Sequence, residues 1–157
     1  MQREGKYSPA RTVNYHSLAI IDAFTELKYL EHQGRIQVDI YETEPDSWRS
    51  IQGADLRPDL FVKVSDPIRR KRWSLWLEID LGTERPRQIK EKLANYWHAY
   101  KHASADDLDV YPSIVFLAPD DERERELRHI INEGKNQEAK KLFITSTIKD
   151  YAALFFS

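Results

Sequence analysis

The segment WSLWLEID (73–80) sets two acids at the end of a strand that is otherwise apolar. Alternate residues of a strand share a face, so the two sets are Trp73, Leu75, Leu77 and Ile79 on one side and Trp76, Glu78 and Asp80 on the other. An unpaired carboxylate is unfavourable at low dielectric. Glu78 and Asp80 therefore form a metal site, belong to a network of ion pairs, or lie at a solvated strand end.

A second apolar strand is predicted just before this one, at DLFVKV (59–64), with SDPIRRKR (65–72) as the connecting turn. If the two strands form a hairpin, the pair Asp59 and Glu78 is centred near residue 68 or 69, inside that turn. This register predicts that the two side chains face each other on one side of the sheet, with Cβ atoms about 5 Å apart.

Two facing carboxylates repel each other unless a cation or a proton lies between them. Oxygen ligands with room for water suit magnesium or manganese better than zinc. Such an ion could bind a scissile phosphate and lower the pKa of an attacking water. The plain alternative is that both acids pair with arginines at the strand ends.

The remaining pattern predicts nine elements in the order α-β-β-β-α-β-α-β-α. They are a helix at 17–30 capped by Asn14, strands at 35–41, 59–64 and 73–80, a helix at 83–101 capped by Thr83, a strand at 110–118, a helix at 120–134, a strand at 140–146 and a short helix through 155. Antiparallel strands followed by crossovers predict an α/β (α+β) fold, a mixed central sheet flanked by helices. Residues 1–14 are expected to form a flexible N-terminal arm, with Pro9 disfavouring an early helix, and residues 15–157 a single domain.

Composition narrows the function classes. The net charge of −2 argues against DNA binding by bulk charge, and the basic run at 69–72 is interpreted as a solvated turn. The chain has no cysteine, which excludes disulfides and thiolate metal sites and fits a cytoplasmic protein. No apolar run approaches the roughly 20 residues of a membrane span, so no membrane partner is expected.

Several segments together resemble the plasmid replication-relaxation family over about residues 15–150. They are YHSLAIIDAF (15–24), YETEPDSW (41–48), RPDL (57–60), LEIDLGTE (77–84) and KLANY (92–96). That family is similar in its core to the PD-(D/E)XK nuclease superfamily. The resemblance therefore implies a restriction-endonuclease-like core that binds magnesium or manganese.

In this superfamily an acid on the second core strand and one on the third bind the metal, and those roles fall on Asp59 and Glu78. The superfamily's lysine normally lies two residues after the second acid, where this chain has Asp80. Asp80 would then be a third ligand or an orienting group, and Lys92 on the next helix would stabilise the phosphate. The alternative is an ion pair between Lys92 and Asp80, with Tyr96 packed against the sheet.

Other candidates surround this set. Glu44 could supply an extra metal ligand, while His16 and Tyr96 would line the site. Three arginines are expected to contact phosphate or DNA: Arg57, Arg85 and Arg87.

The resemblance implies a metal-dependent DNA-nicking or endonuclease domain, relaxase-like, acting in plasmid or mobile-element replication or transfer. The alternatives are a non-catalytic DNA-binding or adaptor module that keeps the nuclease fold, and a plain interaction domain whose acids form ion pairs. Family members often carry a winged-helix segment before the histidine helix, whereas only about fifteen residues precede it here. We therefore expect a fragment or a separate DNA-recognition domain or subunit; a homodimer stays open.

Overall fold

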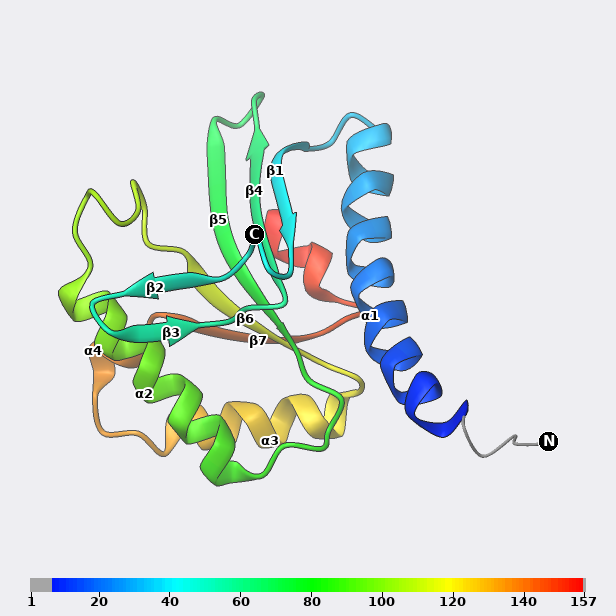
Figure 1. The fold of residues 1–157 in the computed structure, drawn as a ribbon. Coiled ribbons are helices and arrows are strands. Elements are labelled where there is room, and N and C mark those ends of the chain that lie inside the picture. Colours follow the sequence, from blue (N-terminus) through cyan, green and yellow to red (C-terminus); the bar gives the residue numbers. More distant parts are fainter. Residues whose placement is uncertain (1–6, 157) are drawn as a thin grey trace.

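The computed structural model describes the backbone of residues 7–156 and the side chains of residues 15–156 (Figure 1). Its elements, in chain order, are α1 (Tyr7–His32), β1 (Gln37–Thr43), β2 (Arg49–Ile51), β3 (Ala54–Leu56), β4 (Leu60–Asp66), β5 (Lys71–Ile79), α2 (Pro86–His102), β6 (Ser113–Ala118), α3 (Asp121–Asn132), α4 (Gln137–Lys140), β7 (Phe143–Thr147) and the 3₁₀ helix η2 (Tyr151–Phe156). None of the helices in this part of the chain combines the length and apolar character that a membrane crossing requires.

The centre of the fold is a five-stranded mixed sheet in the order β1-β4-β5-β6-β7. Neighbours are antiparallel from β1 to β5 and parallel from β5 to β7. One apolar cluster joins α1 and η2 to one face, and a second joins α2, α3 and the β2–β3 hairpin to the other. The predicted mixed sheet flanked by helices is confirmed.

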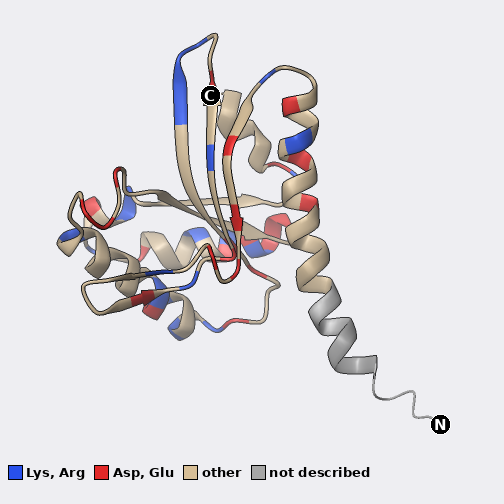
Figure 2. Ribbon diagram, turned by 45° about the horizontal axis from the view of Figure 1, so that its top comes forward, with Lys and Arg blue, Asp and Glu red and all other residues tan. Residues whose placement is uncertain are grey.

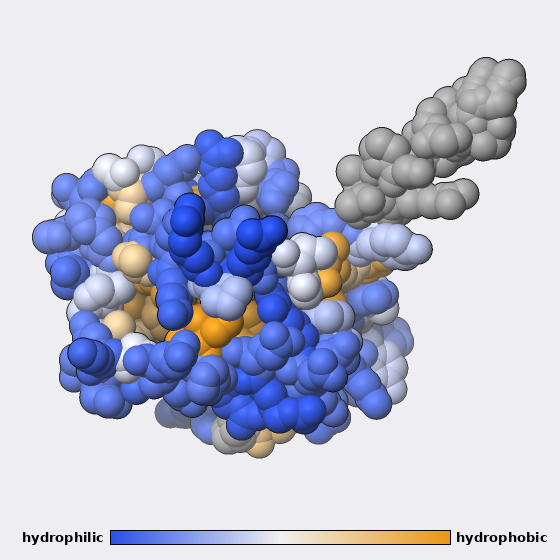
Figure 3. Space-filling view, turned by 90° about the horizontal axis from the view of Figure 1, so that it is seen from below, coloured by the Kyte–Doolittle hydropathy of each residue, from blue (hydrophilic) through white to orange (hydrophobic). Residues whose placement is uncertain are grey.

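The helices α2 and α3 lie together below the sheet in Figure 1. Seen from that side, the surface is mostly hydrophilic, with an apolar hollow at its middle (Figure 3). The charged outer face of α3 follows from its sequence, in which apolar residues recur at helical spacing only at Leu127, Ile130 and Ile131.

The hairpin of β4 and β5 has the predicted register. Leu60 pairs with Leu77, and the pairs continue to Asp66 and Lys71, so the hairpin is centred between residues 68 and 69. The inward residues of β5 also agree with the prediction, since Leu75, Leu77 and Ile79 are buried in the first cluster and Trp73 packs against it.

From the sequence, Ile36, Val38 and Ile40 are expected to share one face of the first strand, but the register shifts between Val38 and Ile40. Val38 faces the first apolar cluster as expected, but beyond the bulge Tyr41 packs there, and Ile40 is 37% exposed. A bulge adds one residue to a strand and turns every later side chain to the opposite face. The acids that follow β1 are therefore turned as well, which matters for the site.

The predicted order of helices and strands lacked two strands, which lie in the polar connection at 42–58. That segment contains β2 and β3, which pair as a two-stranded hairpin closed by Gln52 and Gly53. Both turn residues have positive φ (49° and 83°), the conformation of a two-residue hairpin turn that glycine favours. The structure also adds the short helix α4, and its last element is a 3₁₀ helix.

Two predicted helix starts were wrong. The first helix begins at Tyr7, so Asn14 lies inside it; Pro9 is tolerated because the first-turn N–H groups have no helical partner. Residues 1–6 of the predicted arm lie outside the described residues. The cap of α2 is Arg85, not Thr83, and the Gln88 side chain accepts a hydrogen bond from its N–H at 2.8 Å.

Candidate metal and phosphate site

Three carboxylates lie at the ends of three neighbouring strands: Glu44 directly follows β1, Asp59 directly precedes β4, and Glu78 is near the end of β5. The strand registers end at the pairs Thr43–Leu60 and Leu60–Leu77, so Glu44, Asp59 and Glu78 are each the next residue beyond a paired one. The Asp59 N–H donates to the Leu77 carbonyl at 3.0 Å, which ties the residue before β4 to the end of β5. The bulge in β1 turns Glu44 toward the same side as the other two acids.

Asp59 is the middle of this row and is buried. Its Oδ2 accepts a hydrogen bond from the Ile79 N–H at 2.7 Å, and its Oδ1 lies 3.1 Å from His16 Nε2. Burial, and after it the charge of Glu78, raise the pKa of Asp59 to about 8, with Glu44 adding to the shift. Without a cation the site therefore keeps a proton on Asp59 at neutral pH.

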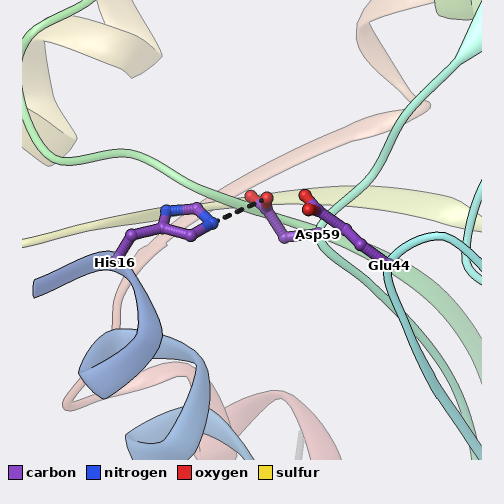
Figure 4. A group of neighbouring side chains, drawn as sticks. All are labelled: His16, Glu44 and Asp59. Carbon is purple, nitrogen blue, oxygen red and sulfur yellow. Dashed lines mark ion pairs between the residues drawn. The ribbon is translucent and has the colours of Figure 1, made fainter. Parts of the chain in front are cut away.

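His16, Glu44 and Asp59 form one group whose ligand atoms all lie within 4.8 Å of one another. Figure 4 shows that the imidazole reaches Asp59 from α1, while the Glu44 carboxylate approaches from the other side. Two oxygens and one nitrogen at this spacing can surround one ion with bonds of about 2.0–2.3 Å.

The raised pKa of Asp59 predicts a pH-dependent stability. The folded chain holds this proton up to about pH 8 and the unfolded chain releases it near 3.8, so the free energy of unfolding falls as pH rises between those values. Asp59→Asn imitates the protonated acid and keeps the acceptor for Ile79. Because one pKa unit is worth about 1.4 kcal/mol, we expect the variant to be more stable than wild type by on the order of 5 kcal/mol at pH 8 and equal near about pH 4. Urea denaturation without metal measures this; a variant with the wild-type pH slope would contradict it.

Glu78 points to α2. Its Oε1 lies 3.1 Å from Lys92 Nζ, and its Oε2 accepts a hydrogen bond from the Tyr96 hydroxyl. Burial raises the pKa of Glu78, while Lys92 and Tyr96 act in the opposite direction. Tyr96 also packs against Trp76, with ring centroids 5.6 Å apart.

Lys92 bridges two acids, since its Nζ also lies 2.9 Å from Glu84 Oε1. Burial by itself would lower the pKa of Lys92, but the charges of Glu78 and Glu84 raise it, so the ammonium stays protonated. A cavity of about 250 Å³ opens beside it. Its lining residues are His16, Arg57, Asp59, Glu78, Ile79, Leu81, Thr83, Glu84 and Lys92. The structure thus gathers five of the ten predicted site residues at one opening: His16, Arg57, Asp59, Glu78 and Lys92.

Asp80 lies apart from this opening and has a different partner. Its Oδ2 is 2.6 Å from Arg123 Nε and its Oδ1 is 3.0 Å from Arg123 Nη2, and both residues are buried. Arg123 also donates to the Glu84 carbonyl at 2.8 Å. The alternative Lys92–Asp80 ion pair is therefore replaced by Lys92–Glu78 and Asp80–Arg123.

The sequence interpretation missed Arg123 as a partner. Arg123 lies in the first turn of α3, and its N–H donates to the capping Asp120. A cation is unfavourable near the positive end of a helix dipole, so an arginine there was a signal of an acidic partner.

The three predicted phosphate-binding arginines lie in different surroundings. Arg57 lines the site cavity, with its guanidinium 4.6 Å from the Trp48 ring and 3.0 Å from Asp55. Arg85 and Arg87 line a neighbouring hollow of about 630 Å³ that shares Thr83 with the site cavity. Arg87 is 90% exposed and lies 3.4 Å from Glu91.

Comparison with known proteins gives one family. The family model described as replication-relaxation matches residues 2–111, more than half of the 157-residue chain. The matched part includes His16, Glu44, Asp59, Glu78 and Lys92 but ends before Arg123. Comparison with curated proteins and with solved structures gives no match. The family suggests a role in plasmid replication or transfer and interaction with DNA, and this chain belongs to the replication-relaxation family.

Proposed function

We propose that this chain is a metal-dependent DNA-processing domain of PD-(D/E)XK type, which nicks DNA during plasmid or mobile-element replication or transfer. The observation that carries the proposal is the row Glu44–Asp59–Glu78, in which His16 contacts the middle acid, Asp59, and Lys92 contacts Glu78. A bound magnesium or manganese ion would polarise a phosphate and lower the pKa of an attacking water.

In this proposal His16, Glu44 and Asp59 hold the ion. The donor set fits, because three ligand atoms share one small volume and the proton on Asp59 can be exchanged for a cation. An imidazole among the ligands makes manganese a better match than magnesium, which prefers oxygen ligands and retained waters.

In this proposal Glu78 does not bind the metal, although the resemblance implies that role for the acid on the third core strand. Its two oxygens accept from Lys92 and Tyr96, so it positions the ammonium at the cavity. Lys92, held by two acids, would stabilise negative charge that develops on a phosphate. Asp80, whose oxygens both bind Arg123, holds α3 against the end of β5.

The metal set can be tested by calorimetric titration of the purified chain with Mn²⁺ at pH 8. We expect Asp59→Asn and His16→Ala each to weaken binding by at least about 10-fold, because each removes a ligand. Asp106→Asn, an exposed acid on the loop after α2, is the charge-matched control and should bind like wild type. Absence of binding by the wild-type chain would leave ion pairs as the role of these acids.

A second candidate is a non-catalytic DNA-binding or adaptor module that keeps this fold. It is favoured by Asp80, which occupies the usual position of the catalytic lysine and is engaged by Arg123. A chain that binds Mn²⁺ and DNA but leaves plasmid intact would support this candidate over the nuclease.

A further inference from the structure

The outer half of the β4–β5 hairpin carries a polar face that no helix of the described residues covers. In Figure 1 the hairpin rises above α2 and α3, and β6 pairs with β5 only from Leu75 onward. The cross-strand pairs Lys63–Ser74, Ser65–Arg72 and Gln37–Ser65 put these side chains on one side of the sheet. We call this surface the hairpin face: Gln37, Lys63, Ser65, Arg70, Arg72 and Ser74.

The hairpin face lies against a hollow of about 950 Å³. The opposite side of the same strands is apolar, since Val62, Val64 and Leu75 are buried in the first cluster and Trp73 packs against it. Alternation of apolar and polar residues is typical of antiparallel strands that have one face on the core and the other face exposed to water or to a charged partner.

The hairpin face is basic once its internal ion pairs are taken into account. Lys and Arg residues gather at the tip of the hairpin in Figure 2. Three acids also line the hollow, but Asp66 lies 2.7 Å from Arg69 and Asp109 lies 3.0 Å from Lys63. Asp39 lines the same hollow as the exposed Arg70 and Arg72, and no ion pair within residues 15–156 engages either arginine.

The floor of the hollow has an unused hydrogen-bonding group. The Ser74 hydroxyl is buried and makes no hydrogen bond to another described residue. A buried hydroxyl without a partner is unfavourable, and a ligand oxygen that reaches it removes that cost.

We propose that the hairpin face binds the phosphate backbone of duplex DNA. Arginine donors with no internal partner suit phosphate oxygens, and backbone contacts position a protein on DNA without reading its sequence. Single-stranded DNA is a poorer match, because its binding uses exposed aromatic platforms, whereas Trp73 packs edge-on against Phe155 at 5.1 Å. The proposal rests on the proposed function in taking DNA as the partner, but it needs neither metal nor cleavage.

The test is fluorescence anisotropy of a labelled duplex of about 20 base pairs, measured in EDTA over a series of salt concentrations. Arg70→Gln with Arg72→Gln should weaken binding about 10-fold at low salt and reduce the slope of log affinity against log salt by about 2, one unit for each lost phosphate contact. Ser74→Ala should weaken binding a few-fold without loss of stability, because no internal hydrogen bond is removed.

The matched control is Lys135→Gln with Lys149→Gln, which removes two exposed positive charges elsewhere. An equal loss of duplex affinity in this control would mean that binding depends on bulk charge, and would overturn the proposal. Wild-type affinity in the double arginine variant would overturn it as well. Absence of duplex binding by wild type, or tighter binding of the single strand, would overturn it too. All of these measurements are made in EDTA, so failure of the metal site leaves this result distinct.

Discussion

Arg123→Ala should lower the free energy of unfolding by about 3–5 kcal/mol, the usual cost of removing one partner of a buried ion pair. Arg123 and Asp80 are 8% and 2% exposed, and both carboxylate oxygens accept from the guanidinium. The substitution leaves Asp80 without its cation and frees the Glu84 carbonyl before α2. Urea denaturation of both proteins at neutral pH measures the difference.

The control for this substitution is Arg125→Ala on the same helix. Arg125 is exposed and should change stability by no more than about 0.5 kcal/mol. If Arg123→Ala matched this control, the Asp80–Arg123 pair would not carry the assigned energy. If Arg123→Ala does lower stability, substitutions of Asp80 should unfold the chain as well. Loss of activity in an Asp80 variant could then not be taken as evidence that Asp80 binds a metal.

Lys92→Met should reduce plasmid nicking by at least about 100-fold, the typical effect of removing one donor that stabilises developing charge. Methionine keeps an unbranched side chain of similar length but removes the ammonium. The buried Glu78 loses a cation; because burial already raises its pKa, it can take up a proton instead of remaining charged. The fold should therefore survive, and the circular dichroism spectrum should match that of wild type.

Lys90→Met is the matched control, because it removes a lysine from the same helix. Its Nζ lies 3.7 Å from Glu133 and its side chain is 56% exposed, away from the site. We expect it to nick like wild type. If Lys92→Met nicked at the wild-type rate, the lysine would serve only to neutralise Glu78 and Glu84.

The central pair of the site could be predicted from the sequence because its geometry is local. A short turn fixes the centre of a hairpin, and the centre fixes which residues face each other; hence the hairpin has the predicted register, and Asp59 and Glu78 line one cavity. The side of β5 that carries Trp76 and Glu78 followed from the same period of two.

The other parts of the site and fold depend on features that the alternation of apolar and polar residues along a strand does not reveal. Whether Glu44 joins Asp59 depends on a one-residue bulge near Asp39, which reverses the face of everything after it. The β2–β3 hairpin has only three residues in each strand, too short for a clear period, although Gln52–Gly53 was a usable turn signal.

Arg123 lies 43 residues from its partner Asp80. Only the parallel pairing of β5 and β6 brings the start of α3 to the end of β5, and that contact cannot be read from local spacing. The same holds for His16, which reaches Asp59 from a different layer of the fold.

The most direct measurement is the conversion of supercoiled plasmid to open circle by the purified chain. Wild type is incubated with Mn²⁺, with Mg²⁺ or with EDTA, and Asp59→Asn is run beside it under the same conditions. The proposed site predicts open circle with Mn²⁺, less with Mg²⁺, none with EDTA, and none with Asp59→Asn. Intact plasmid with wild type in both metals, or equal nicking by Asp59→Asn, would contradict it.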